Sequence, residues 1–168
     1  MVIGPLMQFL AANSWPYLAA RAAVECSQEV IRRHAMSGQN PGPGYRDYPD
    51  HKVAVKPLEG EVKVVALGQP IATSSNTLLV EEGRYAPVIY VPRSDVRFEF
   101  LRENDLTTYC PFKGDARYWN IQVGDDHIGG AVWGYDTPYD EVAELADYVA
   151  FYKDRIDEIT VDGKAPPA

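Results

Sequence analysis

A cysteine and a lysine in one short segment are the residues of this chain best suited to chemistry. The segment 107–119, TTYCPFKGDARYW, places Cys110 and Lys113 beside a glycine turn and several aromatic side chains. A nearby cation favours the reactive thiolate form of a cysteine, and an ammonium holds a carboxylate or phosphate as a point charge. The segment therefore marks a candidate pocket, with Cys110 and Lys113 as candidate catalytic residues.

Both residues also have a structural interpretation. Pro111 limits Cys110 to an extended backbone, and no histidine lies nearby in sequence to act as its base. Cys110 is then a small buried side chain that packs against Phe112. Lys113 precedes a glycine and equally suits a turn whose ammonium points into solvent. The sequence leaves both alternatives open.

One arginine and three aromatic residues extend the candidate pocket. Arg93, in the stretch PRSDVR, is a candidate ligand for an anion, because a guanidinium can bind two oxygens at once. Strand alternation places Tyr118 and Trp119 on opposite faces of a sheet, and Trp133 and Tyr135 on the same face. Tyr118, Trp133 and Tyr135 are candidate ligand-binding residues that could wall a planar molecule. The alternative is ordinary cross-strand packing.

Charge and composition restrict the possible partners. The chain has 168 residues and a net charge of −8, which disfavours nucleic-acid binding and leaves a local basic site for a small anionic ligand. Its two cysteines and three histidines lack the spacing of metal ligands, so we expect neither a metal nor another cofactor. We expect a cytoplasmic location, because cysteines are few, and no association with a membrane. The oligomeric state stays open.

The sequence divides into four parts. Residues 1–38 are alanine-rich and lack strand alternation, which predicts an N-terminal helical extension. Residues 39–50, QNPGPGYRDYPD, are rich in proline and glycine and predict a linker. Residues 51–162 predict one domain, and residues 163–168 form a tail.

Residues 51–162 predict a mainly β fold. Many short segments with alternating apolar residues, separated by turns, favour a compact antiparallel barrel or sandwich. One packed C-terminal helix is expected to begin at Thr137, because Pro138 and two acidic residues follow it. Its apolar stripe would consist of Val142, Leu145, Ala146 and Val149.

Four stretches of this domain, in order, resemble a known family. They are VPRSDVRFEFL, TTYCPFKGDARYW, AVWGYDTPYDEV and DYVAFYKDRIDEI. The chain is similar through residues 51–162 to the bacterial family called domain of unknown function 427. The resemblance implies a compact, mostly antiparallel β domain and no established activity. A nucleotidyltransferase label is sometimes attached to the family, but the chain has no Gly-Ser motif followed by paired aspartates and no P-loop.

These observations leave two classes of function. In the first, the domain binds or acts on a small anionic molecule in a pocket around Cys110, Lys113 and Arg93. In the second, it is a noncatalytic interaction or structural module whose motifs specify the fold. Whether the protein is an enzyme stays open, and the two classes differ in whether Cys110 and Lys113 face a shared cavity.

Overall fold

The computed structural model describes residues 40–167, which form a mainly β unit built from antiparallel strands. The predicted helix in residues 1–38 lies outside the described residues. The strands are β1 (Val53–Leu58), β2 (Val62–Ala66), β3 (Gln69–Ser74), β4 (Thr77–Glu82), β5 (Val88–Pro92), β6 (Leu101–Cys110), β7 (Gly114–Val123), β8 (Asp126–Tyr135), β9 (Tyr148–Phe151) and β10 (Glu158–Val161). The helices are α2 (Pro43–Asp47) and the 3₁₀ segments η1 (Arg93–Asp95), η2 (Phe98–Phe100) and η3 (Asp140–Asp147).

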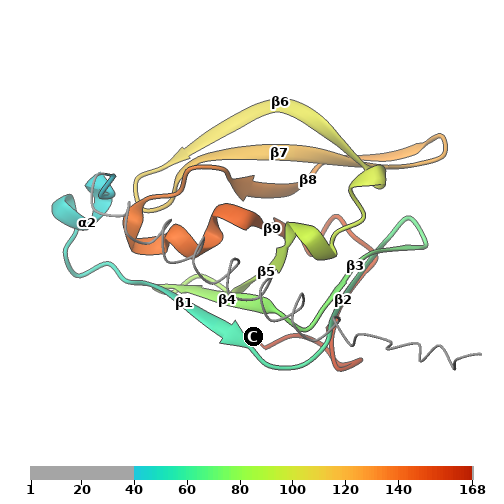
Figure 1. The fold of residues 1–168 in the computed structure, drawn as a ribbon, viewed down its shortest axis with the longest axis horizontal. Helices are drawn as coiled ribbons and strands as arrows, with labels where there is room; N and C mark the ends of the chain where they lie inside the picture. The colour runs from blue at the N-terminus through green and yellow to red at the C-terminus, as the bar shows by residue number, and fades with distance from the viewer. Residues whose placement is uncertain (1–39, 168) are drawn as a thin grey trace, which may run out of the picture. The chain divides into compact units, whose positions relative to one another are not determined.

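Seven strands form one large sheet in the order β1-β4-β5-β9-β8-β7-β6. Figure 1 shows β6, β7 and β8 along one side of the unit and β1 and β4 along the other. The edge strands β1 and β6 do not pair with each other, so the sheet is open. The barrel that the sequence allowed is therefore not formed, while the antiparallel, sandwich-like arrangement remains consistent with the structure.

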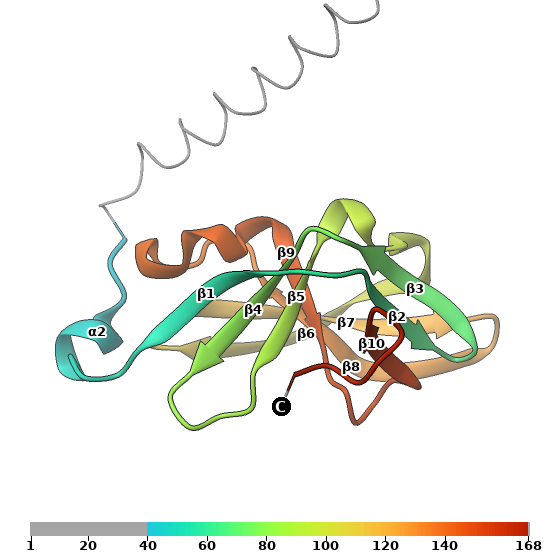
Figure 2. The ribbon, with the colours of Figure 1, turned by 90° about the horizontal axis from the view of Figure 1, so that it is seen from below.

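A second sheet of three strands, in the order β10-β2-β3, packs against one face of the large sheet. Figure 2 places this small sheet at the end of the unit away from α2. The core between the two sheets contains Val64, Ile71, Ile121 and Val132, which are all fully buried. Trp119 belongs to the same core.

The opposite face of the large sheet carries a second core that is rich in tyrosine. The strand register aligns Tyr118 with Trp133, Trp133 with Ala150, and Ala150 with Tyr90, so these side chains share one face. Tyr135 lies two residues beyond Trp133 and belongs to this second core. The predicted separation of Tyr118 from Trp119, and the shared face of Trp133 and Tyr135, are confirmed.

The C-terminal helix differs from its prediction. The structure has a 3₁₀ helix, η3, whose N-cap is Tyr139 rather than Thr137, and whose backbone is non-helical at Val142. Val142 and Leu145 are its buried residues, and their spacing of three matches the three-residue turn of a 3₁₀ helix. Val149 of the expected stripe lies instead in β9. The helix cannot extend to Val149 because β9 begins directly after Asp147.

The segment that was expected to be a linker contains a short helix in contact with the domain. The backbone N–H of Gly44 in α2 donates to the carbonyl of Pro111 at 2.9 Å. The Tyr45 ring meets the Phe112 ring edge-on, with centroids 5.2 Å apart. Residues 40–50 therefore belong to the folded unit, because they bind the β6–β7 turn. No helix in the described part of the chain is long and apolar enough to cross a membrane.

Candidate functional site

The β6–β7 turn directs Lys113 inward. Its backbone N–H donates to the carbonyl of Cys110 at 3.3 Å, and Gly114 follows with a φ of 101°. A Cβ at position 114 would lie 3.2 Å from the carbonyl oxygen of Thr137. Both the backbone conformation and the space therefore favour glycine. Lys113 keeps only 8% of its surface exposed, so the solvated turn lysine that the sequence allowed is not what forms.

Lys113 shares a carboxylate with a histidine. Its Nζ contacts one oxygen of Glu82, and Nε2 of His51 lies 3.1 Å from the other oxygen. Burial acts to raise the pKa of Glu82, but the hydrogen bonds and charges of Lys113 and His51 outweigh it and lower that pKa overall. Glu82 is therefore an anion near neutral pH, in contact with two basic groups.

This ion pair faces a small cavity. The cavity has a volume of about 150 Å³. It is lined by Val80, Glu82, Tyr85, Ala86, Val88, Tyr90, Lys113 and Trp133. Tyr85 is 65% exposed, so the cavity meets solvent on its side. One charged pair and three aromatic rings around an otherwise apolar space are typical of a small-molecule site.

A larger hollow lies next to α2. It measures about 660 Å³ and is lined by Asp47, Tyr48, Pro49, Asp50, His51 and Phe112. Tyr48 is 64% exposed. Neither Lys113 nor Glu82 lines the hollow, although His51, which contacts Glu82, does. Its size reflects open surface between α2 and β1. The smaller cavity is the better candidate, since a ligand there would contact the largely buried Lys113–Glu82 ion pair.

Tyr90 adds a hydroxyl to the cavity. The indole Nε1–H of Trp133 donates to this hydroxyl at 3.2 Å. Burial raises the pKa of Tyr90 above that of an ordinary tyrosine, although the Trp133 hydrogen bond opposes this. The hydroxyl therefore keeps its proton and can donate it. The Trp133 ring also packs against the ring of Tyr152, and the two ring centroids are 4.4 Å apart.

Three of the predicted site residues lie in the second core but do not line the cavity. Cys110 is a half-buried free thiol that packs against this core. The Tyr118 hydroxyl and Oγ1 of Thr108 are 2.8 Å apart. Tyr135 is buried, and its burial raises its pKa. The three residues share the second core with Trp133, and Trp133 lines the cavity together with Lys113.

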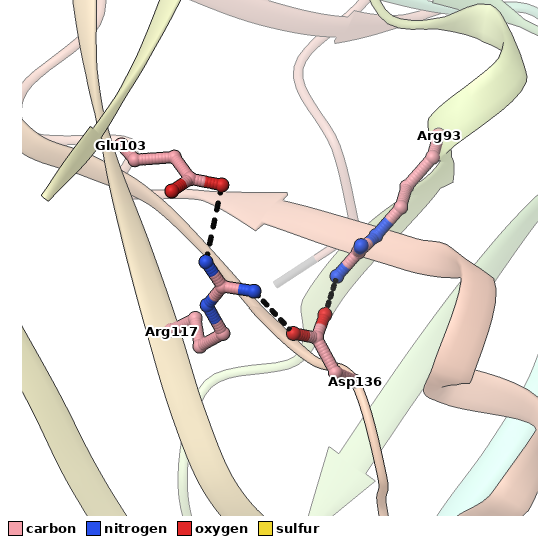
Figure 3. Close-up of polar contacts among 4 residues, drawn as sticks. All are labelled: Arg93, Glu103, Arg117 and Asp136. Carbon is pink, nitrogen blue, oxygen red and sulfur yellow. Dashed lines mark hydrogen bonds and ion pairs between the residues drawn. The ribbon is translucent and has the colours of Figure 1, made fainter.

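Arg93 is the exception, because it lies on the opposite face. Its Nη2 donates to Asp136 at 2.6 Å, and its guanidinium carbon lies 5.1 Å from the ring centre of Trp119. Arg117 donates to the other oxygen of Asp136 at 2.8 Å and contacts Glu103 at 3.1 Å. Figure 3 shows the two arginines converging on Asp136. The predicted grouping of Arg93 with Lys113 in one pocket is therefore wrong.

Glu82, His51 and Tyr45 were not found by sequence reasoning. Glu82 lies two and four residues after the apolar Val80 and Leu78 of β4, and this shared spacing is a weak signal that it faces inward. The Tyr45 hydroxyl is buried without a hydrogen-bond partner, and burial, followed by the charges of Glu141 and Glu82, raises its pKa to about 12. Among residues 40–167 no group of three or more acidic, histidine or cysteine side chains could hold a metal ion.

The comparison with known proteins places the chain in a family. Residues 54–162 match the family model described as Domain of unknown function (DUF427), which confirms the resemblance seen in the sequence. The match covers more than half of the chain, and the chain belongs to this family. No curated protein matches the sequence.

Proposed function

We propose that this domain binds a small molecule with an acid group, which contacts Lys113 inside the aromatic cavity. The observation that carries the proposal is the burial of Lys113, whose side chain is 10% exposed and lines the cavity. A long charged side chain is rarely held away from water unless it is paired. Glu82 supplies that pairing, and in the proposed complex the acid group of the ligand contacts the same ammonium.

The size of the cavity restricts the ligand. An engineered protein cavity of about 150 Å³ holds benzene, whereas drug-sized ligands occupy pockets of about 300 Å³ or more. The Lys113 cavity has about the volume of the first kind. The ligand is therefore compact, and the faces of Trp133 and Tyr90 favour a planar or branched apolar part. Cys110 does not contact the ligand in this proposal, since it lies outside the lining residues.

Benzoate tests the proposal, with benzamide as the neutral molecule of the same shape. In an NMR titration of the full chain, we expect benzoate to shift the Trp133 indole N–H signal and the Lys113 amide signal to saturation. A Kd of about 1 mM or tighter, or about −4 kcal/mol, is the scale for so small a ligand. Benzamide should bind more weakly, because it forms no charge-assisted hydrogen bond with Lys113.

Two lysine variants separate the cavity from general charge. Lys113→Met should abolish the benzoate shifts. Lys63→Met, on the exposed side of β2, removes the same charge elsewhere and should leave them unchanged. Equal benzoate binding by the two variants would remove Lys113 from the proposal.

The alternative function is an interaction module. The edge strand β6 favours it, because its outer edge is unpaired among the described strands and it carries the exposed residues Leu106 and Tyr109. An exposed edge can accept a strand from another protein. If benzoate and related probes do not bind, and variants at Leu106 and Tyr109 abolish binding to a partner, this alternative replaces the cavity.

A further inference from the structure

The Lys113 cavity presents two opposite charges rather than one. Lys113 and Glu82 both line it, and their side chains are 10% and 21% exposed. We infer that its ligand is a small zwitterion, an α-amino acid with a compact apolar side chain. The inference rests on the proposed function and adds the class of ligand.

A simple anion binds at a cost to the ion pair. When the anion draws Lys113 away, it leaves Glu82 partly buried without its main partner, and removing one partner of a buried pair is strongly unfavourable. His51, at 3.1 Å from the other oxygen of Glu82, compensates fully only when it is protonated. The net attraction for an anion is therefore smaller than the charge of Lys113 alone implies.

A zwitterion avoids this cost. Its carboxylate pairs with the ammonium of Lys113 and accepts a hydrogen bond from the Tyr90 hydroxyl. Its own ammonium replaces that of Lys113 as the partner of Glu82. No buried charge is left unpaired, and the net charge of the site stays the same. The aromatic faces of Tyr85 and Trp133 also attract an ammonium group.

The cavity volume selects the side chain. A space of about 150 Å³ has room for a branched group of a few carbons, and not for a long or polar side chain. Valine meets this limit and serves as the probe. Isovalerate has the same skeleton without the amino group, and isobutylamine has it without the carboxylate, so the three molecules separate the two charges.

Isothermal titration of the full chain with the three probes tests the inference. We expect valine to bind about tenfold more tightly than either isovalerate or isobutylamine, since each of these leaves one charge of the pair unmatched. In Glu82→Gln the order should reverse. Valine loses the partner of its ammonium, while isovalerate gains because Lys113 is no longer held by a carboxylate.

A neighbouring variant controls for net charge. Glu81→Gln removes a carboxylate that is paired with exposed Lys56, so it should keep the wild-type order of the three probes. Isovalerate binding as tightly as valine to the wild type would overturn the zwitterion and leave the anion-binding cavity standing. If none of the three probes binds and benzoate also fails, both proposals fall. The wild-type comparison decides the question even if Glu82→Gln does not fold.

Discussion

Lys113 shows why the candidate site was only partly visible in the sequence. The motif around it predicted an important lysine, but its partner Glu82 lies 31 residues earlier, at the end of β4. Nothing local connects the two positions, since only the sheet brings them together. The shared face of Trp133 and Tyr135 was predicted correctly because strand alternation is a local rule.

The ion pair predicts a pH-dependent loss of stability. Glu82→Gln should lower the free energy of unfolding at neutral pH by about 2 kcal/mol, less than for a fully buried pair because the Glu82 side chain is 21% exposed. The folded state lowers the pKa of Glu82, so its stabilisation is present above the unfolded value of about 4.3 and is lost as the pH falls through the lower folded value. Urea unfolding of both proteins across this range measures the difference.

The difference in the free energy of unfolding between the wild type and Glu82→Gln should disappear at acidic pH. Glu81→Gln, whose pair with Lys56 is exposed, should change stability by about 0.5 kcal/mol or less at any pH. A Glu82→Gln effect that stays constant with pH, or that is no larger than the Glu81→Gln effect, contradicts the assigned ion pair.

Arg93 gives a prediction that separates the two faces of the sheet. Arg93→Met should destabilise the fold by about 1–2 kcal/mol, because Asp136 loses a charged hydrogen bond and the Trp119 ring loses its contact with the Arg93 guanidinium. It should change the Kd for benzoate by no more than about twofold, or about 0.4 kcal/mol. The NMR titration measures this. A large loss of benzoate binding in a folded Arg93→Met protein would restore Arg93 to the pocket.

Among the structural elements, alternation predicted the buried strands but only the last part of the exposed strand β6. β2, β4, β5 and β8 carry apolar residues that face a core, and the sequence predicted a strand within each of them. Most of β6 has the sequence RENDLTTY and is exposed, so its apolar residues do not alternate with polar ones as in a half-buried strand. The 3₁₀ form of η3 could not be predicted, because a spacing of three between apolar residues also fits an α-helix.

The short helix α2 was missed because its stability comes from contacts. Five residues containing proline and glycine have little tendency to form a helix alone. Its position depends on the hydrogen bond from Gly44 to Pro111 and on the rings of Tyr45 and Phe112. The same contacts bring His51 to Glu82, so the segment before β1 helps to build the site.

Gly44 provides a test of this docking. A Cβ at position 44 would lie 2.7 Å from the Phe112 ring and 2.8 Å from the Pro111 oxygen, so Gly44→Ala should release the segment. Trypsin should then cut after Arg46 much faster than in the wild type. Gly129→Ala meets no atom closer than 4.0 Å and serves as the control. Rapid cutting after Arg46 in the wild type would instead support the linker that the sequence predicted.

At the scale of the whole molecule, one open sheet carries two different cores. The face covered by the small sheet has a mainly aliphatic core, and the ion pairs of Asp136 with Arg93 and Arg117 lie at its margin. The other face gathers the tyrosines, Trp133 and the buried lysine. The net charge of −8 repels anions at long range, so an acid group gains its attraction only close to Lys113. We therefore expect selectivity for small ligands that can enter the cavity.

A crystal structure of the full chain with benzoate tests the central claim most directly. We expect benzoate in the cavity lined by Trp133 and Tyr90, with a carboxylate oxygen within hydrogen-bond distance of Lys113 Nζ and the Lys113–Glu82 contact lengthened. Benzoate bound only at other surfaces, or a cavity filled by its own side chains with the Lys113–Glu82 contact intact at saturating benzoate, would contradict it.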